Sequence, residues 1–315
     1  MIIPKISEKV NKFTEKKRKA VIIGNKLLAT KDKKLIKRGY RMVDCSTELT
    51  FKFCPECGET HITKTNLCRD RLCPVCSWRL SLKRYRVMLQ MLEMIDVTQF
   101  DAAFLTLTVR NCQAADLAAT VKAMSRAFSN ITKLKLWKPV QGFAKSVEIT
   151  YNDTARTMHP HLHILLLMEK GSYTNQLMPA IKDAWQHQLQ IDYKPIIDLR
   201  EVRNYNDGQD ITAAVLETFK YAVKSKDLED MPMKDFKLFA QQINGLRLIS
   251  FGGVLKVIKS MIAADLENLT EDEKEVISCK NCGSEMQQRL YKWSFGQAYY
   301  ESLKINNTEM SNNVE

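Results

Sequence analysis

Met158-His159-Pro160-His161-Leu162-His163-Ile164-Leu165-Leu166-Leu167-Met168 combines three of the five histidines of the chain with a run of aliphatic residues. The aliphatic run predicts a β-strand, on which alternate side chains project from the same face. We therefore expect His161 and His163 to stand side by side. Two neutral imidazoles on one face form half of a divalent-metal site. The alternative is a strand whose histidines face solvent or bond to the backbone, but three histidines within five residues favour a site.

A carboxylate that could complete the site lies on the preceding predicted strand, residues 143–151. Glu148 shares one face of that strand with small and polar residues, and a hairpin would place it beside His161 and His163. Two imidazoles and one carboxylate leave coordination positions open for phosphate oxygens, as Mg²⁺ or Mn²⁺ chemistry requires. His159 has the parity of an additional or substitute ligand, although Pro160 leaves its orientation open.

The order of elements after residue 100 predicts an α+β fold. Apolar residues recur with the period of a strand or of a helix in successive segments. The predicted elements are, in order, strand 104–109, helix 116–137, strand 143–151, the histidine strand, helix 174–190, strand 196–202 and helix 211–225. This is the split βαβ (ferredoxin/RRM-like) arrangement, an antiparallel sheet with helices on one face and the other face open. We expect four parts: a basic N-terminal arm (1–41), a zinc-binding module with a linking helix (42–98), the split βαβ domain (99–260) and a C-terminal tail (261–315).

The charge of the chain is concentrated at its start. The net charge is +12, and residues 1–41 contain fourteen Lys and Arg against three acidic residues. This segment is expected to be a mobile, phosphate-binding extension; the alternative is a solvated tail. There is no signal-peptide pattern and no run of about eighteen apolar residues, so we expect a cytoplasmic protein that does not span a membrane.

The nine cysteines indicate zinc rather than disulfides. Cys54-x-x-Cys57 and Cys73-x-x-Cys76 are separated by fifteen residues, a spacing at which two knuckles can bind one structural Zn²⁺. The ligand set stays open, because nearby residues could substitute. These are Cys68, Cys45 and His61.

A third knuckle, Cys279-x-x-Cys282, has the same pattern. It could form a second zinc site with Cys68 and another ligand, or it could bind zinc between two chains and so make a homodimer. Around the zinc module, basic residues accompany Trp78, a combination that suits phosphate contacts and base stacking. The basic residues include Arg69, Arg71 and Arg79. Ordinary solvation of a helix is the alternative.

A candidate nucleophile lies on the last predicted helix, 211–225. Glu217, Tyr221 and Lys224 are spaced four and three apart and would share a face. The tyrosine hydroxyl, with an ordinary pKa of about 10, needs a nearby cation to become a phenolate, and Lys224 or Lys220 could supply it. Glu217 could then take a proton from water. The alternative is a buried tyrosine beside a surface Glu-to-Lys ladder.

Together these motifs resemble the replication initiator (Rep) proteins of rolling-circle plasmids, in the HUH endonuclease superfamily. The resemblance covers roughly residues 41–257 and rests on motifs that occur in this order. They are Cys68-Arg-Asp-Arg-Leu-Cys-Pro-Val-Cys-Ser-Trp-Arg79, Phe104-Leu-Thr-Leu-Thr-Val-Arg-Asn111, Gly142 through Glu148-Ile-Thr150, His159-Pro-His-Leu-His163, Glu217-Thr-Phe-Lys-Tyr-Ala-Val-Lys224 and Phe251-Gly-Gly-Val-Leu-Lys256. The chain departs from the family in adding Cys54-x-x-Cys57 and Cys279-x-x-Cys282.

The resemblance implies a metal-dependent nickase that cuts single-stranded DNA at the double-strand origin. Tyr221 would join the 5′ phosphate covalently, and His161, His163 and Glu148 would hold Mg²⁺ or Mn²⁺. Glu217 would activate water for termination, as in the single-tyrosine branch of the superfamily. DNA contacts would come from Arg69, Arg71, Arg79, Arg110 and Lys220. A host helicase is an expected partner from the family alone. The rival functions are an HUH transposase or relaxase and a non-catalytic, zinc-containing nucleic-acid-binding regulator.

Overall fold

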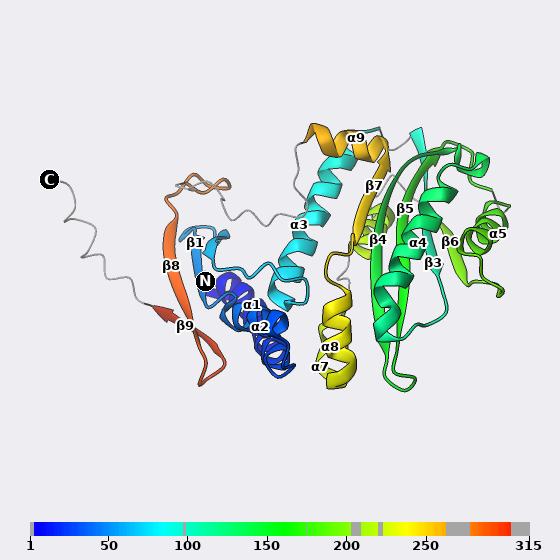
Figure 1. Ribbon diagram of the computed structural model, residues 1–315. Coiled ribbons are helices and arrows are strands. Elements are labelled where there is room, and N and C mark those ends of the chain that lie inside the picture. The colour runs from blue at the N-terminus through cyan, green and yellow to red at the C-terminus, as the bar shows by residue number, and fades with distance from the viewer. Residues whose placement is uncertain are drawn as a thin grey trace. The chain divides into compact units, whose positions relative to one another are not determined.

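The computed structural model describes residues 3–96, 99–174, 176–202, 209–219, 223–262 and 278–303. The chain divides into two compact units, each with its own β-sheet (Figure 1). Residues 1–79 and 268–315 form the cysteine-rich unit, and residues 80–267 form the split βαβ unit. This division differs from the four parts expected from the sequence, because both ends of the chain contribute to one unit.

The basic segment at the start of the chain forms two packed helices, α1 (Ile3–Leu28) and α2 (Lys33–Asp44). The side chain of Asp32 caps α2 by accepting hydrogen bonds from two backbone amides of its first turn. The expectation of a mobile extension is wrong. The apolar residues between the lysines recur at helical spacing, so they form a stripe that is buried when the helix packs. The buried apolar residues of α1 are Ile6, Val10, Phe13, Ala20, Ile23 and Leu27.

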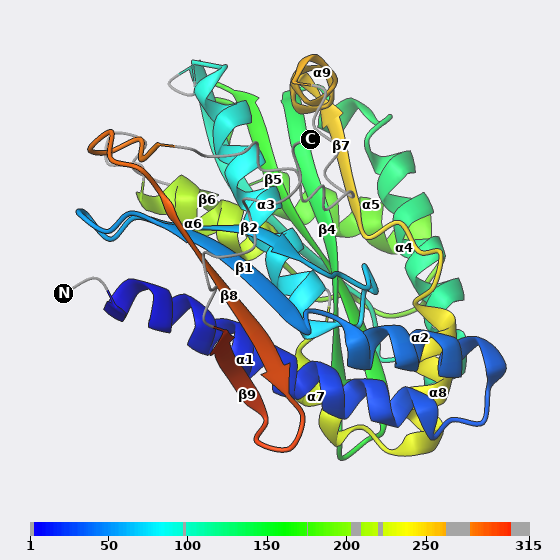
Figure 2. The same cartoon turned by 90° about the vertical axis from the view of Figure 1, so that its left-hand side faces the viewer.

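Half of the β-sheet of the cysteine-rich unit comes from the C-terminal part of the chain. Two N-terminal and two C-terminal strands pair antiparallel in the order β2-β1-β8-β9. Figure 2 shows β8 beside β1. Residues 287–303, expected to belong to a tail, therefore complete the N-terminal sheet. The strands are β1 (Glu48–Phe53), β2 (Thr60–Thr65), β8 (Gln287–Ser294) and β9 (Tyr299–Leu303).

The split βαβ unit has the predicted order of elements. Helix α3 (Pro74–Glu93) begins in the cysteine-rich unit, and its residues from 80 onward belong here. The antiparallel sheet has the order β6-β3-β5-β4-β7, so the fold class is confirmed and β7 adds a further edge strand. The elements are β3 (Phe100–Thr108), α4 (Leu117–Ile131), β4 (Val140–Asn152), β5 (Thr157–Glu169), α5 (Leu177–Leu189), β6 (Ile197–Val202), α6 (Gln209–Thr218) and β7 (Ile249–Gly253).

Helices pack against both faces of this sheet (Figure 1). Helices α4 and α5 lie on one face. On the face that carries the histidines, apolar side chains of α3, α6 and α9 (Val254–Met261) bury one end of the sheet. The expectation that this whole face is open is therefore wrong: Phe104 and Leu165, two residues along their strands from the polar site, already belong to a core.

Short helices complete the unit. They are η2 (Ala114–Asp116), η3 (Lys135–Trp137), α7 (Ser225–Asp230) and α8 (Met233–Gln242). Helix α8 contacts η2 and α4. Among the described residues, no helix combines the length and the apolar character needed to cross a membrane.

We expect Gly253→Ala to destabilise the split βαβ unit strongly. Gly253 has φ = +57°, and a Cβ there would lie 1.9 Å from the carbonyl oxygen of Gln141 on the neighbouring strand. The strand pair would have to separate, at a cost above about 2 kcal/mol. Gly171→Ala is the control, because Gly171 also has positive φ but open space around it. Urea unfolding of the full chain, followed by circular dichroism, measures both; equal losses would contradict the predicted clash.

Lys145 gives a second stability prediction. Its side chain is 5% exposed, and its Nζ lies 3.4 Å from Ser125 Oγ. Burial, and then the charge of Arg247, lower the pKa of Lys145 from 10.5 to about 8. Below pH 8 the folded state must hold this buried charge, and between about pH 8 and 10.5 the folded state loses its proton before the unfolded state does. The free energy of unfolding should therefore rise with pH in that window.

Lys145→Met should raise the free energy of unfolding at pH 7 by up to about 3 kcal/mol and should abolish the rise above pH 8. The exposed Lys138, changed to Met, is the control. Chemical denaturation from pH 6 to 10.5 checks the prediction. If the profiles of wild type and Lys145→Met run parallel, Lys145 is not the cause.

Candidate functional site

The hairpin of β4 and β5 brings a carboxylate to the histidines. Glu148 pairs directly with His161, and on the other side of β5 Thr106 of β3 pairs with His163. Glu148 Oε2 lies 3.2 Å from His161 Nε2 and 2.8 Å from His163 Nε2. The expected juxtaposition of these three side chains is confirmed. One ligand atom from each lies within 4.8 Å of the other two.

The surroundings orient both imidazoles. His163 Nδ1 lies 3.3 Å from Thr106 Oγ1, and its ring stacks on Phe104 with centroids 5.5 Å apart. His161 Nδ1 lies 3.3 Å from the carbonyl oxygen of His159. Contacts at Nδ1 leave Nε2 of each ring directed at the carboxylate, as outer contacts do for metal-binding histidines.

Glu148 is ionised in this arrangement. Burial raises the pKa of its carboxyl, but hydrogen bonds from His161 and His163 outweigh burial and hold the pKa well below its usual range. An anionic oxygen and two imidazole nitrogens form a donor set that suits divalent cations such as Mn²⁺ and, less well, Mg²⁺.

His159 does not join this group. It pairs with Thr150, one step further along the hairpin, and its ring centroid lies 5.5 Å from that of His161. Burial and the charge of His161 lower the pKa of His159. The structure therefore does not support His159 as an additional ligand, and its backbone carbonyl instead orients His161.

A cavity of about 410 Å³ opens beside His163. Thr106 and Arg200 line it from the sheet, and the half-buried Glu217 lines it from α6. The carboxylate expected to activate water thus shares a cavity with one of the candidate metal ligands. Arg200 lies on this face because it pairs with Phe104, which is two residues from Thr106 on β3.

The helix expected over 211–225 ends earlier. Helix α6 stops at Thr218, whose hydroxyl donates to Ala214 O, and Phe219 is buried in the core. Lys224 is exposed and has an extended backbone at the N-terminal cap of α7. The expectation that Lys224 follows Glu217 on one helix face is therefore wrong. Tyr221 and Lys220 lie outside the described residues, so their roles remain predictions.

The predicted DNA-contacting arginines occupy different settings. The exposed Arg110 stacks on Tyr193, with 3.9 Å between guanidinium and ring, and its amide donates to the Tyr193 hydroxyl at 3.0 Å. In the cysteine-rich unit Arg71 is exposed, whereas Arg79 lies 5.8 Å from the ring of Phe13. Tyr193 lies 83 residues from Arg110 in the sequence, and no local motif predicts that the two are partners.

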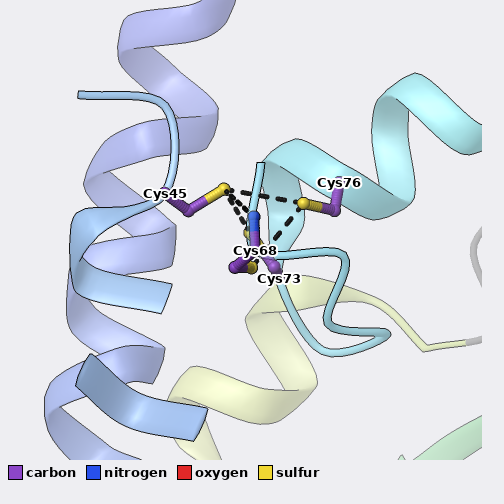
Figure 3. Close-up of side chains that lie close together, drawn as sticks. All are labelled: Cys45, Cys68, Cys73 and Cys76. Atoms are coloured by element: carbon purple, nitrogen blue, oxygen red, sulfur yellow. Dashed lines mark hydrogen bonds between the residues drawn. The ribbon is translucent and has the colours of Figure 1, made fainter. Parts of the chain in front are cut away.

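The cysteines form two groups of four that differ from the expected set. Cys73 and Cys76 lie with Cys45 and Cys68 (Figure 3). The expectation that Cys54 and Cys57 join Cys73 and Cys76 at one zinc is wrong. Cys45, at the end of α2, and Cys68 replace the first knuckle. Helix α2 contacts the loop before α3 through an ion pair of Arg38 with Asp70 and a hydrogen bond from Arg41 to the carbonyl oxygen of Cys68.

The second group joins Cys54 and Cys57 to Cys279 and Cys282. Pairing of β8 with β1 brings these two knuckles together from opposite ends of the chain. The sulfur atoms of Cys54 and Cys282 are 3.3 Å apart, and those of Cys57 and Cys279 are 3.4 Å apart. Cys57 and Cys282 are exposed, and the Ser284 hydroxyl and amide lower the pKa of Cys282 to about 6.

The sulfur spacing fits a tetrahedral metal site. Bonds of about 2.3 Å to zinc give tetrahedron edges of about 3.8 Å, whereas a disulfide needs about 2.0 Å. In the first group, which we call the buried cluster, Cys45 and Cys76 sulfurs are 3.5 Å apart and Cys68 and Cys76 sulfurs 3.6 Å apart. Hydrogen bonds within the buried cluster lower the pKa of Cys76, while burial raises that of Cys73. All four can ionise together only if a cation is present.

Comparisons with known proteins identify the family. The family model described as "Replication protein" matches residues 59–301. "Protein rep" of Bacillus amyloliquefaciens is 31% identical over 76% of this chain and 79% of that protein. "Protein rep" of Lactiplantibacillus plantarum is 33% identical over 74% of this chain and 77% of that protein. "Protein rep" of Streptococcus pneumoniae is 29% identical over 81% and 85%, respectively. No solved structure gives a significant match.

The match covers the histidine hairpin, helix α6 and both groups of cysteines except Cys45, Cys54 and Cys57. The predicted resemblance is thereby confirmed at the level of the family. The chain belongs to the Replication protein family, the Rep proteins that initiate replication of rolling-circle plasmids.

Proposed function

We propose that this initiator cuts one DNA strand at the plasmid origin through a covalent 5′-phosphotyrosine intermediate. Glu148, His161 and His163 would hold Mg²⁺ or Mn²⁺, which polarises the scissile phosphate when bound. The observation that carries the proposal is the convergence of these three side chains beside a cavity that Glu217 also lines.

The chemistry is a pair of transesterifications. The Tyr221 phenolate attacks phosphorus, the new bond joins phosphorus to the tyrosine oxygen, and the bond to the 3′ oxygen breaks, so the 3′ hydroxyl leaves with a proton. The phosphotyrosine keeps the energy of the broken phosphodiester, and a 3′ hydroxyl can reverse the step and join strands. At termination Glu217 would take a proton from the water that attacks phosphorus, which releases Tyr221.

The substrate is proposed to be single-stranded at the cut. The scissile phosphate must reach the metal that Glu148, His161 and His163 would hold, and apolar side chains of α3, α6 and α9 already cover one end of this sheet face. An unpaired strand can cross the remaining polar end with its backbone phosphate at the metal site. The Arg110–Tyr193 stack would offer a cation and an aromatic face to that strand.

We also propose that both groups of cysteines bind structural zinc. Thiolates select Zn²⁺, and each group supplies the four ligands of a closed structural site. The zinc ions would join segments that are distant in sequence and so hold the cysteine-rich unit together. This unit would grip origin duplex next to the cut.

Covalent capture tests the nicking proposal. The protein, incubated with single-stranded origin oligonucleotides and Mn²⁺, should form a protein–DNA adduct that migrates slowly on denaturing gels. Tyr221→Phe should abolish the adduct because it removes the nucleophilic oxygen. Glu217→Ala should form the adduct but release it at least about tenfold more slowly, because general base assistance is lost.

Tyr299→Phe is the matched control, since Tyr299 is an exposed tyrosine of the other unit. It should behave as wild type. An adduct that persists in Tyr221→Phe would refute the assignment of the nucleophile. No adduct from any variant or from wild type, with origin DNA still bound, would favour the non-catalytic regulator.

The metal site gives a separate prediction. Glu148→Gln and His163→Ala should each lower the nicking rate by at least about a hundredfold, with partial recovery at high Mn²⁺ concentration. Asp198→Asn is the control, because Asp198 lies on the same face, opposite Thr106, but outside the group of three. Initial rates measured across a Mn²⁺ titration decide the matter. A wild-type rate in Glu148→Gln at limiting Mn²⁺ would exclude Glu148 as a ligand.

A further inference from the structure

The most unusual charged residue of the cysteine-rich unit is Lys17. Its side chain has no exposed surface, although it lies on α1 among lysines that face solvent. Its Nζ donates hydrogen bonds to the carbonyl oxygens of Val43, at 2.5 Å, and Cys45, at 2.7 Å. These carbonyls end helix α2, so Lys17 is tied to the backbone of a residue in the buried cluster.

Lys17 forms no ion pair with an Asp or Glu among the described residues. Its Nζ lies 5.8 Å from the ring of Trp293 and 5.6 Å from that of Phe295, and its remaining polar contacts are carbonyl oxygens. A fully buried ammonium needs a compensating negative charge, because transfer from water is otherwise very costly. Burial lowers the pKa of Lys17, and the negative charges of Cys45, Cys73 and then Asp44 oppose that shift.

The buried cluster needs a compensating positive charge. Four thiolates around Zn²⁺ leave a net charge of −2, and all four cysteines here are buried. Peptide N–H groups supply part of the compensation: the amide of Arg69 donates to Cys76 Sγ at 3.2 Å, and the amide of Cys68 donates to Cys45 Sγ at 3.4 Å. These dipoles spread the charge of the sulfurs but do not change the net value.

We propose that Lys17 is the buried counter-cation of a zinc centre at Cys45, Cys68, Cys73 and Cys76, and that its charge sets how tightly this centre holds zinc. Lys17 and the centre then stabilise each other: the ammonium halves the net charge of the metal site, and the site supplies the anion that the ammonium lacks. This inference rests on the zinc assignment proposed above and is independent of the nicking chemistry.

The second group of cysteines is an internal reference. Cys57 and Cys282 are exposed there, so water can solvate its negative charge. A variant of Lys17 should therefore weaken zinc binding at the buried cluster alone. A general loss of folding in the cysteine-rich unit would affect both sites.

Four variants of the full chain separate charge from hydrogen bonding. Lys17→Met removes the charge and the donors, Lys17→Gln removes the charge and keeps donors for the two carbonyls, and Lys17→Arg keeps both. Lys12→Met removes a charge from the exposed side of the same helix. Each variant is also combined with Cys57→Ser, which disables the second group of cysteines. Zinc release from the buried cluster can then be measured without a contribution from the second group.

Wild type should contain two zinc ions per chain. After addition of a chelating dye, Lys17→Met and Lys17→Gln should release zinc from the buried cluster at least about tenfold faster than wild type, as substitution of outer partners does at other metal sites. Lys17→Arg should retain most of the wild-type behaviour, and Lys12→Met all of it. Release from the second group should be unchanged throughout.

Wild-type release kinetics in Lys17→Gln would overturn the proposal, because hydrogen bonding alone would then suffice. Equal acceleration at both groups would also overturn it. If Lys17→Met and Lys17→Gln fail to fold, excess zinc should restore folding by mass action, and no recovery would count against the proposal. A wild-type chain without zinc would refute the zinc assignment itself and leave the covalent-adduct assay unaffected.

Discussion

The pairing of Glu148 with His161 across the β4–β5 hairpin is the constraint on which the candidate site depends. A shift of one residue would move Glu148 to the opposite face of the sheet, among the side chains that pack under α4 and α5. The shift is prevented by burial, since the face opposite Glu148 carries buried apolar side chains such as Val147, Ile149 and Leu162, which a shift would exchange with the polar residues of the site. The core that surrounds the two strands thus determines where the carboxylate lies.

The same sheet face serves packing at one end and chemistry at the other. Phe104 stacks on His163, so the core reaches the edge of the polar site and fixes the imidazole. The cavity beside His163 lies between the sheet and α6, the helix that precedes Tyr221. Helix α6 ends at Thr218 and α7 begins at Ser225, so the proposed nucleophile lies between these two helices in the sequence.

The alternation of side chains along a strand made the group of Glu148, His161 and His163 predictable. Every second residue faces the same side of a sheet, so the two histidines must share a face. The helix over 211–225 was less predictable: apolar spacing continues through Phe219, but the chain ends its helix where that side chain enters the core. The cysteine groups could not be paired from spacing, since two-residue knuckles are interchangeable until strands bring them together. The pairing of β8 with β1 spans more than two hundred residues, and nothing local to either strand specifies it. The basic arm was misread because solvent-facing lysines dominate the composition of α1, while its buried stripe contributes few residues per turn.

Ligand chemistry would separate the two kinds of metal site proposed for this chain. Divalent zinc binds imidazole and carboxylate more tightly than Mn²⁺ or Mg²⁺ does, so the donors at Glu148, His161 and His163 cannot by themselves exclude it. The thiolate groups would bind zinc more strongly still, and the eight cysteines would take up two zinc ions before the histidine site competes for zinc at low concentration. The histidine site would then be occupied by Mn²⁺ or Mg²⁺ because these cations are the more available ones. The thiolate sites would be filled with zinc as the cysteine-rich unit folds. Closed sites with slow exchange suit a structural role, and a site with open coordination positions beside a cavity suits a phosphate that must enter and leave.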